Sequence, residues 1–223
     1  MEHITQSRIM RVNVLGNGDH WKLFKRGTEG KLIVCNMPPI DFDSDEVNAT
    51  CMVDFKMMKA LFEGKSNLDK YDWVLGTRPR KWMEMQPQFY MKYAQNIKGF
   101  HTHIPAYAQL PGHTIAQAAT NYSCGHMAVD YACRTMKATE VHMYGFDSMF
   151  DMNLRSHTDN FLESDRGPLN THRMSSNWRP IFGKFFREFD KVKFFIYHSH
   201  DGLKFKAPDN VTIVVEKINE ESN

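Results

Sequence analysis

The sequence predicts an α/β fold, a single Rossmann-like domain with a mostly parallel central sheet. Short apolar runs alternate with helical stretches along most of the chain, and no repeat or low-complexity linker interrupts them. A length of 223 residues is compatible with one large domain. A hydrophobic content of 42% supports a full core, and 13% aromatic residues are too many for a disordered chain. We therefore expect one domain over residues 1–223.

The first half of the chain contains five apolar runs that we interpret as strands. A short helix beginning near Asp19 separates the first two runs. A helix over 56–64, ended by Gly64, follows the third run, and an aromatic-rich helical segment follows the fourth. The expected strands span residues 11–16, 31–36, 49–55, 72–77 and 97–104.

The second half begins with the clearest helix, which starts near Ser123 and runs to about Lys137, with a strand over 139–146 directly behind it. Residues 147–177 are polar and have no steady period. Irregular chain of this length inside a compact domain is usually functional or disordered, so we expect an active-site segment there. A helix over 180–189 and strands over 191–198 and 210–218 close the chain.

A glycine turn, Gly16-Asn17-Gly18, follows the first strand, as in nucleotide-binding folds. The dinucleotide fingerprint needs a third glycine where this chain has Trp21, and an acidic residue where the second strand ends in Asn36. A Walker loop is excluded because no Gly-Lys-Ser/Thr follows. What remains is a turn suited to one phosphate or one nucleotide ring, with the side-chain amides of Asn17 and Asn36 able both to donate and to accept hydrogen bonds. The alternative is an ordinary turn in which asparagine tolerates an unusual backbone angle.

A second motif opens with Ser123-Cys124-Gly125 at a helix start, followed by a strand ending Glu-Val-His-Met-Tyr-Gly-Phe over 140–146. This combination resembles the small motif of the eukaryotic-type sialyltransferases, glycosyltransferase family 29. That family has a Ser/Thr-x-Gly helix start before a strand of the form Glu-Val-x-x-Tyr-Gly-Phe. Its Gly-Asn turn after the first strand and its asparagine after the second are similar to Gly16-Asn17 and Asn36. The resemblance spans roughly 12–55 and 120–198, and the middle third is unmatched.

The resemblance implies a variant GT-A type fold and an inverting, metal-independent glycosyltransferase. Such an enzyme moves a sugar from a pyrimidine nucleotide-sugar, linked to CMP or UDP, to an acceptor hydroxyl, with no other cofactor. A helix N-terminus favours a phosphate or carboxylate, which fits the second motif. The residues expected to bind the nucleotide are Gly16, Asn17, Gly18, Asn36, Ser123, Gly125 and Tyr144.

The expected catalytic residues are His172 and Asp147. His172 precedes a helix and a strand and resembles a family histidine, although Asn177 stands where the family has glutamate. Asp147 lies just past a strand, at the usual crevice of open α/β sheets. We expect His172 to act as base or phosphate donor, because imidazole needs no pKa shift to work near neutral pH. We expect Asp147 to place the acceptor, or to act as the base in place of His172. Asp151 is a further base candidate, and His157 matches an earlier family histidine by order.

Two other functions compete with this interpretation. A non-catalytic nucleotide-binding module would keep the two motifs and need no base. A zinc metallohydrolase would use His101-x-His103 or His198-Ser199-His200-Asp201, since residues two apart on a strand face the same side. Neither pair has the spacing of known zinc motifs. We expect no metal, because the family that the chain resembles does not depend on one and because we identify no Asp-x-Asp pair for a sugar-nucleotide magnesium.

The acceptor is predicted only by class. The family implies a glycan. The basic, aromatic stretch over 76–93 contains Arg78, Arg80 and Lys81 beside aromatic side chains, which suit a nucleic-acid strand. If this stretch binds nucleic acid, the acceptor would be a hydroxyl on a modified DNA base, such as a hydroxymethylated one, that is flipped from the duplex. The alternative is an amphipathic helix with a solvated face.

The remaining features concern location. The four cysteines form no C-x-x-C pair and lie in apolar or helical stretches, which favours buried thiols in a reducing compartment. The first ten residues lack the basic start and apolar core of a signal peptide, and no apolar run approaches the ~20 residues of a membrane span. We expect a cytoplasmic protein without a membrane partner. Its oligomeric state is left open.

Overall fold

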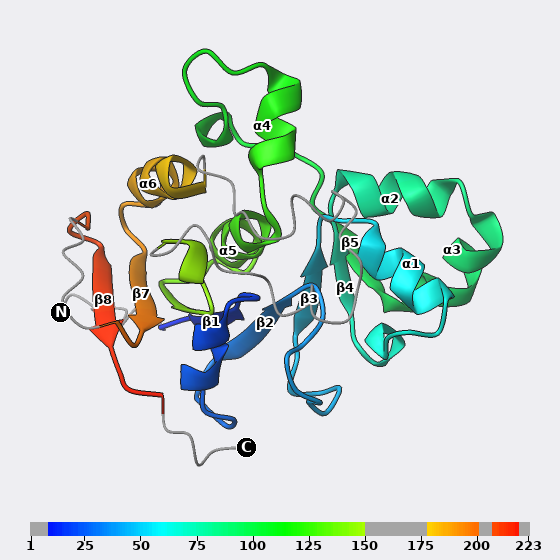
Figure 1. Ribbon diagram of the computed structural model, residues 1–223, viewed down its shortest axis with the longest axis horizontal. Coiled ribbons are helices and arrows are strands. Elements are labelled where there is room, and N and C mark those ends of the chain that lie inside the picture. Colours follow the sequence, from blue (N-terminus) through cyan, green and yellow to red (C-terminus); the bar gives the residue numbers. More distant parts are fainter. Residues whose placement is uncertain (1–8, 150–177, 201–206, 219–223) are drawn as a thin grey trace, which may run out of the picture.

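The computed structural model describes residues 9–149, 178–200 and 207–218. These residues form one sheet of eight strands, all parallel, in the order β5-β4-β3-β2-β1-β6-β7-β8 (Figure 1). The strands are β1 (Arg11–Leu15), β2 (Lys31–Cys35), β3 (Ala49–Met52), β4 (Trp73–Leu75), β5 (Ile97–Phe100), β6 (Glu140–Tyr144), β7 (Lys193–His198) and β8 (Val211–Val215).

The predicted α/β class and parallel sheet are confirmed, and each strand lies inside its predicted range. The helices are less regular than expected. The segment over 76–93 is two helices, because Pro87 begins a second one after Gln86. The α-helices are α1 (Lys56–Phe62), α2 (Thr77–Glu84), α3 (Pro87–Tyr93), α4 (Ile115–Asn121), α5 (Cys124–Arg134) and α6 (Trp178–Glu188).

The helix α4 was not predicted. Its apolar pattern is weak, since Ala118 is the one residue of the helix that is buried. Its N-terminus, however, has a complete capping box, in which Thr114 accepts from the Gln117 backbone N–H and the Gln117 side chain accepts from the Thr114 N–H. The Thr-x-x-Gln spacing is the sequence signal that indicates this start.

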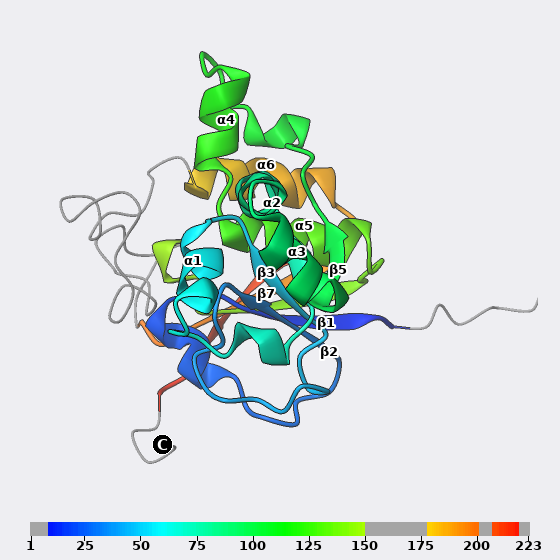
Figure 2. The ribbon, with the colours of Figure 1, turned by 90° about the vertical axis from the view of Figure 1, so that its right-hand side faces the viewer.

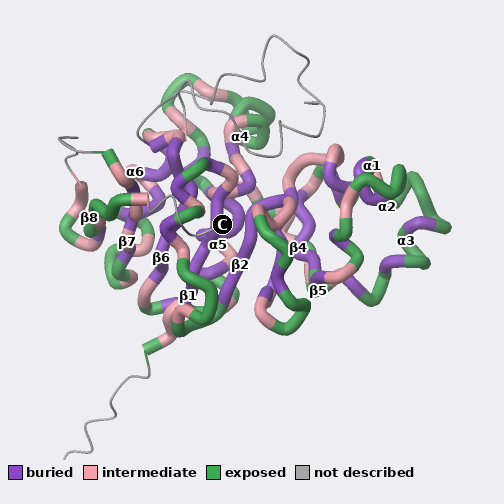
Figure 3. Tube along the Cα trace, turned by 60° about the horizontal axis from the view of Figure 1, so that its bottom comes forward, coloured by how far each residue is buried: buried purple, intermediate pink, exposed green. Residues whose placement is uncertain are grey.

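The two faces of the sheet are covered differently (Figure 2). Helices α5 and α6 pack on one face, where Val12 and Val14 of β1 join Met127 of α5 in the largest core cluster. On the other face, α1 to α3 cover the β3–β5 side, and irregular chain around Phe42 covers β1 and β2. The central strands β1, β2 and β6 are almost wholly buried, whereas much of α2 and α3 is exposed (Figure 3).

The strand order reverses direction at β1. From β1 the chain continues to β2 on one side, and later returns to β6 on the other. In open α/β sheets, ligands bind in the crevice outside the carboxyl ends of the strands at such a switch point. We call this edge of the sheet, where the segments that follow β1 and β6 lie, the crevice. No helix among the described residues is long and apolar enough to cross a membrane.

Candidate functional site

The turns after β1 and β6 interlock at the switch point. The Gly16 N–H donates to the Tyr144 carbonyl at 2.7 Å, and the Gly18 N–H donates to the Gly145 carbonyl at 2.9 Å. A Cβ on Gly16 would lie 2.4 Å from the Gly145 oxygen, and one on Gly18 would lie 2.3 Å from Cγ of Asp147. Close packing therefore requires both glycines. In this conformation their N–H groups bind the neighbouring turn rather than face a ligand.

The two asparagines predicted to bind the nucleotide contact one another. Asn17 Nδ2 donates to the Cys35 carbonyl at 2.8 Å, and Asn36 Nδ2 donates to Asn17 Oδ1 at 2.7 Å. Asn36 has a left-handed backbone, with a φ of 59°, which asparagine tolerates better than most residues. It is 6% exposed, and within the described part of the chain its Oδ1 has no hydrogen-bond partner. A buried acceptor without a donor is unusual and suits a ligand N–H or O–H.

The start of α5 lies beside this pair. The Cys124 thiol donates to the Cys51 carbonyl, and the Asn36 backbone amide also approaches the Cys124 sulfur. A Cβ on Gly125 would lie 2.9 Å from the Phe146 ring, so this glycine allows the helix to approach the turn after β6. The first N–H groups of a helix have no partner within it and favour an anion.

Ser123 caps α5 through a buried histidine. The Ser123 hydroxyl lies 2.7 Å from His126 Nδ1, and the Ser123 N–H donates to the same nitrogen at 3.1 Å. His126 Nε2 contacts the Trp178 carbonyl at 3.2 Å, and the ring stacks on Phe182 with centroids 4.0 Å apart. Burial lowers the pKa of His126 to about 3. A neutral histidine therefore joins the starts of α5 and α6, and the capping role of Ser123 is observed.

Tyr144 occupies the core on the opposite face of the sheet from α5. Its side chain is 4% exposed and stacks on Tyr197 with centroids 4.2 Å apart, while Phe24 contacts its edge. Burial raises its pKa well above the ordinary value of a phenol. The structure therefore places the Tyr144 ring in the packing below the crevice, and only its backbone carbonyl borders the turn.

Asp147 is buried in the crevice and pairs with a histidine that the sequence analysis did not single out. His20 Nδ1 lies 2.8 Å from Asp147 Oδ1, although the N–H is not aligned well enough to form a regular hydrogen bond. The Asp147 carboxylate also accepts from the His20 backbone N–H at 3.3 Å. On its other side, His20 Nε2 lies 2.9 Å from Ser199 Oγ. His20 belongs to the 3₁₀ helix η1 (Asp19–Leu23), directly after the glycine turn.

Two further histidines surround His20. The ring of His200 packs edge-on at 4.9 Å between centroids, and that of His198 at 6.3 Å. Burial, together with the neighbouring His20 and His200, lowers the pKa of His198. The segment predicted as a zinc alternative thus lies at the crevice, but no group of three or more His, Cys, Asp or Glu residues in the described ranges is arranged to hold a metal ion.

The other histidine pair has a structural partner. His101 Nε2 lies 2.9 Å from Oδ1 of Asp130, which is fully buried on α5. Tyr107 donates to the same carboxylate at 2.6 Å, and Arg134 donates to it at 3.2 Å. These donors hold the pKa of Asp130 below its usual value against the opposing effect of burial. The cluster links the end of β5 to α5, and it gives the His101 ring a partner within the protein.

The basic stretch over 76–93 has the features of an amphipathic surface. Arg78 pairs with Asp54 at 2.7 Å, and Arg80 pairs with Glu84 at 2.8 Å one helical turn away. Trp82 and Phe89 contact each other with centroids 5.0 Å apart and belong to the core beneath the helices. These contacts favour the amphipathic interpretation over a nucleic-acid surface.

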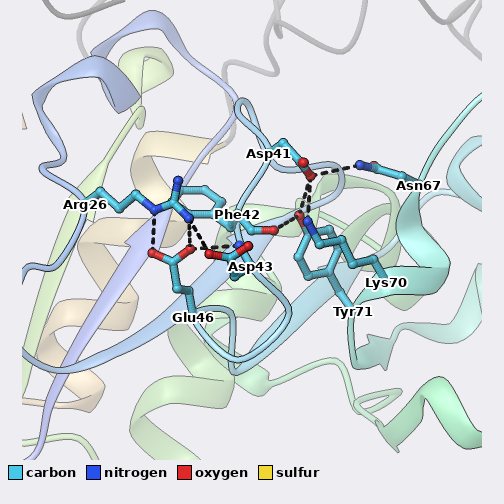
Figure 4. Close-up of polar contacts among 8 residues, drawn as sticks. All are labelled: Arg26, Asp41, Phe42, Asp43, Glu46, Asn67, Lys70 and Tyr71. Atoms are coloured by element: carbon cyan, nitrogen blue, oxygen red, sulfur yellow. Dashed lines mark hydrogen bonds and ion pairs between the residues drawn. The ribbon is translucent and has the colours of Figure 1, made fainter.

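The expectation that the chain has no Asp-x-Asp pair is wrong, because the sequence contains the carboxylate run Asp41-x-Asp43-x-Asp45. In Figure 4, Asp43 pairs with Arg26 at 2.8 Å, and Asp41 pairs with Lys70 at 2.9 Å. The Lys70 ammonium holds the pKa of Asp41 below its usual value. Two carboxylates of the run thus pair with cations of the chain itself, and these ion pairs connect the β2–β3 segment to Lys70 and Arg26.

A cavity of about 250 Å³ lies near this connection, where β2 begins. It is therefore separate from the crevice at the carboxyl ends of the strands. Its lining residues are Phe24, Gly27, Thr28, Gly30, Lys31, Leu32, Phe42, Asp45, Glu46 and Asn48.

Several predicted residues lie outside the described ranges, namely Asp151, His157, His172, Asn177 and Asp201. The role of His172 therefore stays a prediction. Comparisons with family models, curated proteins and solved structures gave no match. Function is accordingly inferred from the sequence motifs and the crevice.

Proposed function

We propose that the protein is a nucleotide-sugar-dependent glycosyltransferase of the sialyltransferase-like, variant GT-A type. It would transfer a sugar from a CMP- or UDP-linked donor to an acceptor hydroxyl, on a glycan rather than on a hydroxymethylated DNA base, because Arg78 and Arg80 pair with acidic side chains of the chain itself. The single observation behind this proposal is the Asn17–Asn36 pair beside the start of α5, at the switch point of a parallel sheet. The motif resemblance to glycosyltransferase family 29, which includes these two asparagines, also supports it.

The asparagine pair suits a nucleotide, and the family resemblance is what favours a pyrimidine one. The buried Oδ1 of Asn36 needs a donor, which the amino group of cytosine, the N3–H of uracil or a ribose hydroxyl supplies. The N–H groups at the start of α5 favour the phosphate. In this proposal the sugar of the donor projects toward Asp147, which packs against Gly18 of the glycine turn. Nucleotide, sugar and a candidate acid–base group would then lie in sequence along one edge of the sheet.

Nucleotide preference tests this proposal. Calorimetric titration with CMP, UDP, GDP and NAD should show binding of CMP or UDP and weaker binding of the other two. Asn36→Ala should weaken that binding by about tenfold, since a hydrogen bond is worth ~1 kcal/mol and the variant also removes the support of Asn17. Asn67→Ala, at an exposed asparagine that donates to Asp41, is the matched control and should bind normally. Preference for NAD would contradict the proposal.

Metal dependence is a second test. We expect transfer to persist in EDTA, because the carboxylates of Asp41 and Asp43 pair with Lys70 and Arg26. The assay is nucleotide release from the donor before and after dialysis against EDTA. Activity that disappears with EDTA and returns with Mn²⁺ would contradict a metal-independent reaction.

A further inference from the structure

Three side chains from distant parts of the sequence meet in the crevice in a linear order. Asp147 follows β6, His20 follows β1 and Ser199 follows β7. Asp147 Oδ1 lies 2.8 Å from His20 Nδ1, and His20 Nε2 lies 2.9 Å from Ser199 Oγ. His20 is 4% exposed and Asp147 is 2% exposed. This order of carboxylate, imidazole and hydroxyl is the arrangement in which a histidine removes a proton from a hydroxyl.

We propose that His20 is the general base of this site, that Asp147 is its positioning residue, and that the acceptor hydroxyl binds where the Ser199 hydroxyl now contacts Nε2. The inference rests on the proposed function. In the transfer step, the acceptor oxygen forms a bond to the anomeric carbon of the sugar while its proton passes to Nε2. The bond from that carbon to the nucleotide phosphate breaks, and its electron pair leaves with the phosphate.

The position of Asp147 determines which nitrogen can take the proton. With the carboxylate at Nδ1, the imidazole keeps its proton there, and the lone pair of Nε2 points at the hydroxyl. The carboxylate then stabilises the imidazolium that forms. The poorly aligned N–H of His20 is compatible with this role, because catalytic hydrogen bonds often tighten only when substrate is bound.

The remaining neighbours of His20 support this role. His198 and His200 face the ring from the segment after β7, and burial beside His20 and His200 lowers the pKa of His198. Among the described residues, Asp147 is the carboxylate that pairs with His20. His20 also follows Asn17 by three residues in the same turn, so the base lies next to the proposed nucleotide site.

The same geometry suits a serine nucleophile, but the crevice favours an external hydroxyl. A serine nucleophile needs N–H donors aimed at the oxyanion that forms. In the glycine turn of the described chain, the N–H groups of Gly16 and Gly18 donate to the carbonyls of Tyr144 and Gly145. In this proposal the Ser199 hydroxyl occupies the acceptor position, and the acceptor hydroxyl displaces it on binding.

The first experiment measures release of CMP and UDP from CMP-sialic acid and UDP-glucose, with water or added alcohol as acceptor, beside calorimetry with the free nucleotides. His20→Ala should lower kcat by about 10²–10⁴ and leave nucleotide affinity unchanged. Added imidazole should restore part of its activity, which a purely structural role would not allow. Asp147→Asn should lower kcat similarly, and Asp147→Glu should recover part of it. His103→Ala, at an exposed histidine, is the control and should match the wild type.

The second experiment separates the base from a nucleophile. Ser199→Ala should keep transfer within a few-fold of the wild type, and a fluorophosphonate probe should leave Ser199 unlabelled. Abolished turnover in Ser199→Ala with labelling of Ser199 would overturn the proposal, as would normal turnover in His20→Ala. Failure of the wild type to bind CMP or UDP contradicts the proposed function itself, whereas normal binding and transfer without His20 contradicts only the assignment of the base.

Discussion

The free energy of unfolding is expected to fall steadily as the pH drops from about 6.5 to 3, because His126 is buried as a neutral ring. Its pKa is about 3 in the folded protein, against an ordinary value of 6.5. In that window the unfolded chain binds a proton that the folded chain does not, so stability is complete above 6.5 and is lost as the pH falls. The slope is about 1.4 kcal/mol per pH unit, or about 4–5 kcal/mol in all.

Urea unfolding followed by circular dichroism at several pH values measures this slope. The matched variant is His126→Asn, in which the amide oxygen can still accept from the Ser123 N–H that now binds Nδ1. The variant should be less stable at pH 7, since it loses the stacking on Phe182. The dependence of its free energy of unfolding on pH should be weaker, by the slope that corresponds to about one proton. His142, whose pKa burial lowers to about 4, adds a similar slope over the narrower range from pH 6.5 to 4, and this contribution is common to both proteins. Parallel curves for the two proteins would contradict the buried neutral His126.

Gly16→Ala is expected to destabilise the protein by about 3 kcal/mol or more, at the upper end of the usual cost of overpacking. The added Cβ would lie 2.4 Å from the Gly145 oxygen and 2.9 Å from its carbonyl carbon. Both are backbone atoms, so relief requires the turns after β1 and β6 to separate. That movement would also break the hydrogen bond from the Gly16 N–H to Tyr144.

Gly183→Ala is the control for this substitution. It lies within α6, and a Cβ there would meet no atom within 4 Å. Alanine in a helix interior is favoured over glycine by roughly 0.5–1 kcal/mol, so this variant should be as stable as the wild type or more so. If Gly16→Ala and Gly183→Ala unfold at the same urea concentration, the tight interlock of the two turns is wrong.

Most of the strands were predictable because each is a short apolar run that the sheet buries on both faces, whereas the edge strands β5 and β8 are only partly buried. The Asn17–Asn36 contact was also predictable in outline, since consecutive parallel strands place their carboxyl ends side by side. Sequence alone did not indicate the partner of His20, because Ser199 lies 179 residues away and only the order β1-β6-β7 brings the two together. The signal that was present is the position of His20 immediately after the glycine turn.

The glycines illustrate a different limit. Gly16 and Gly18 are spaced as in a phosphate-binding turn, but glycine serves equally where two backbones approach closely. The structure shows the second use, with Asp147 and the Gly145 carbonyl occupying the space that a Cβ would need. A glycine pattern alone does not distinguish these uses, because both need the same missing side chain.

Amide chemical-shift mapping with CMP and UDP tests the central claim most directly, because it locates the nucleotide without an acceptor. We expect the largest shifts at the side-chain amides of Asn17 and Asn36 and at the backbone amides of Cys124 and Gly125, with smaller shifts around His20. These groups surround the carboxyl ends of β1 and β2. Shifts confined to the cavity near Phe42, or no shifts at saturating CMP and UDP, would contradict a nucleotide site in the crevice.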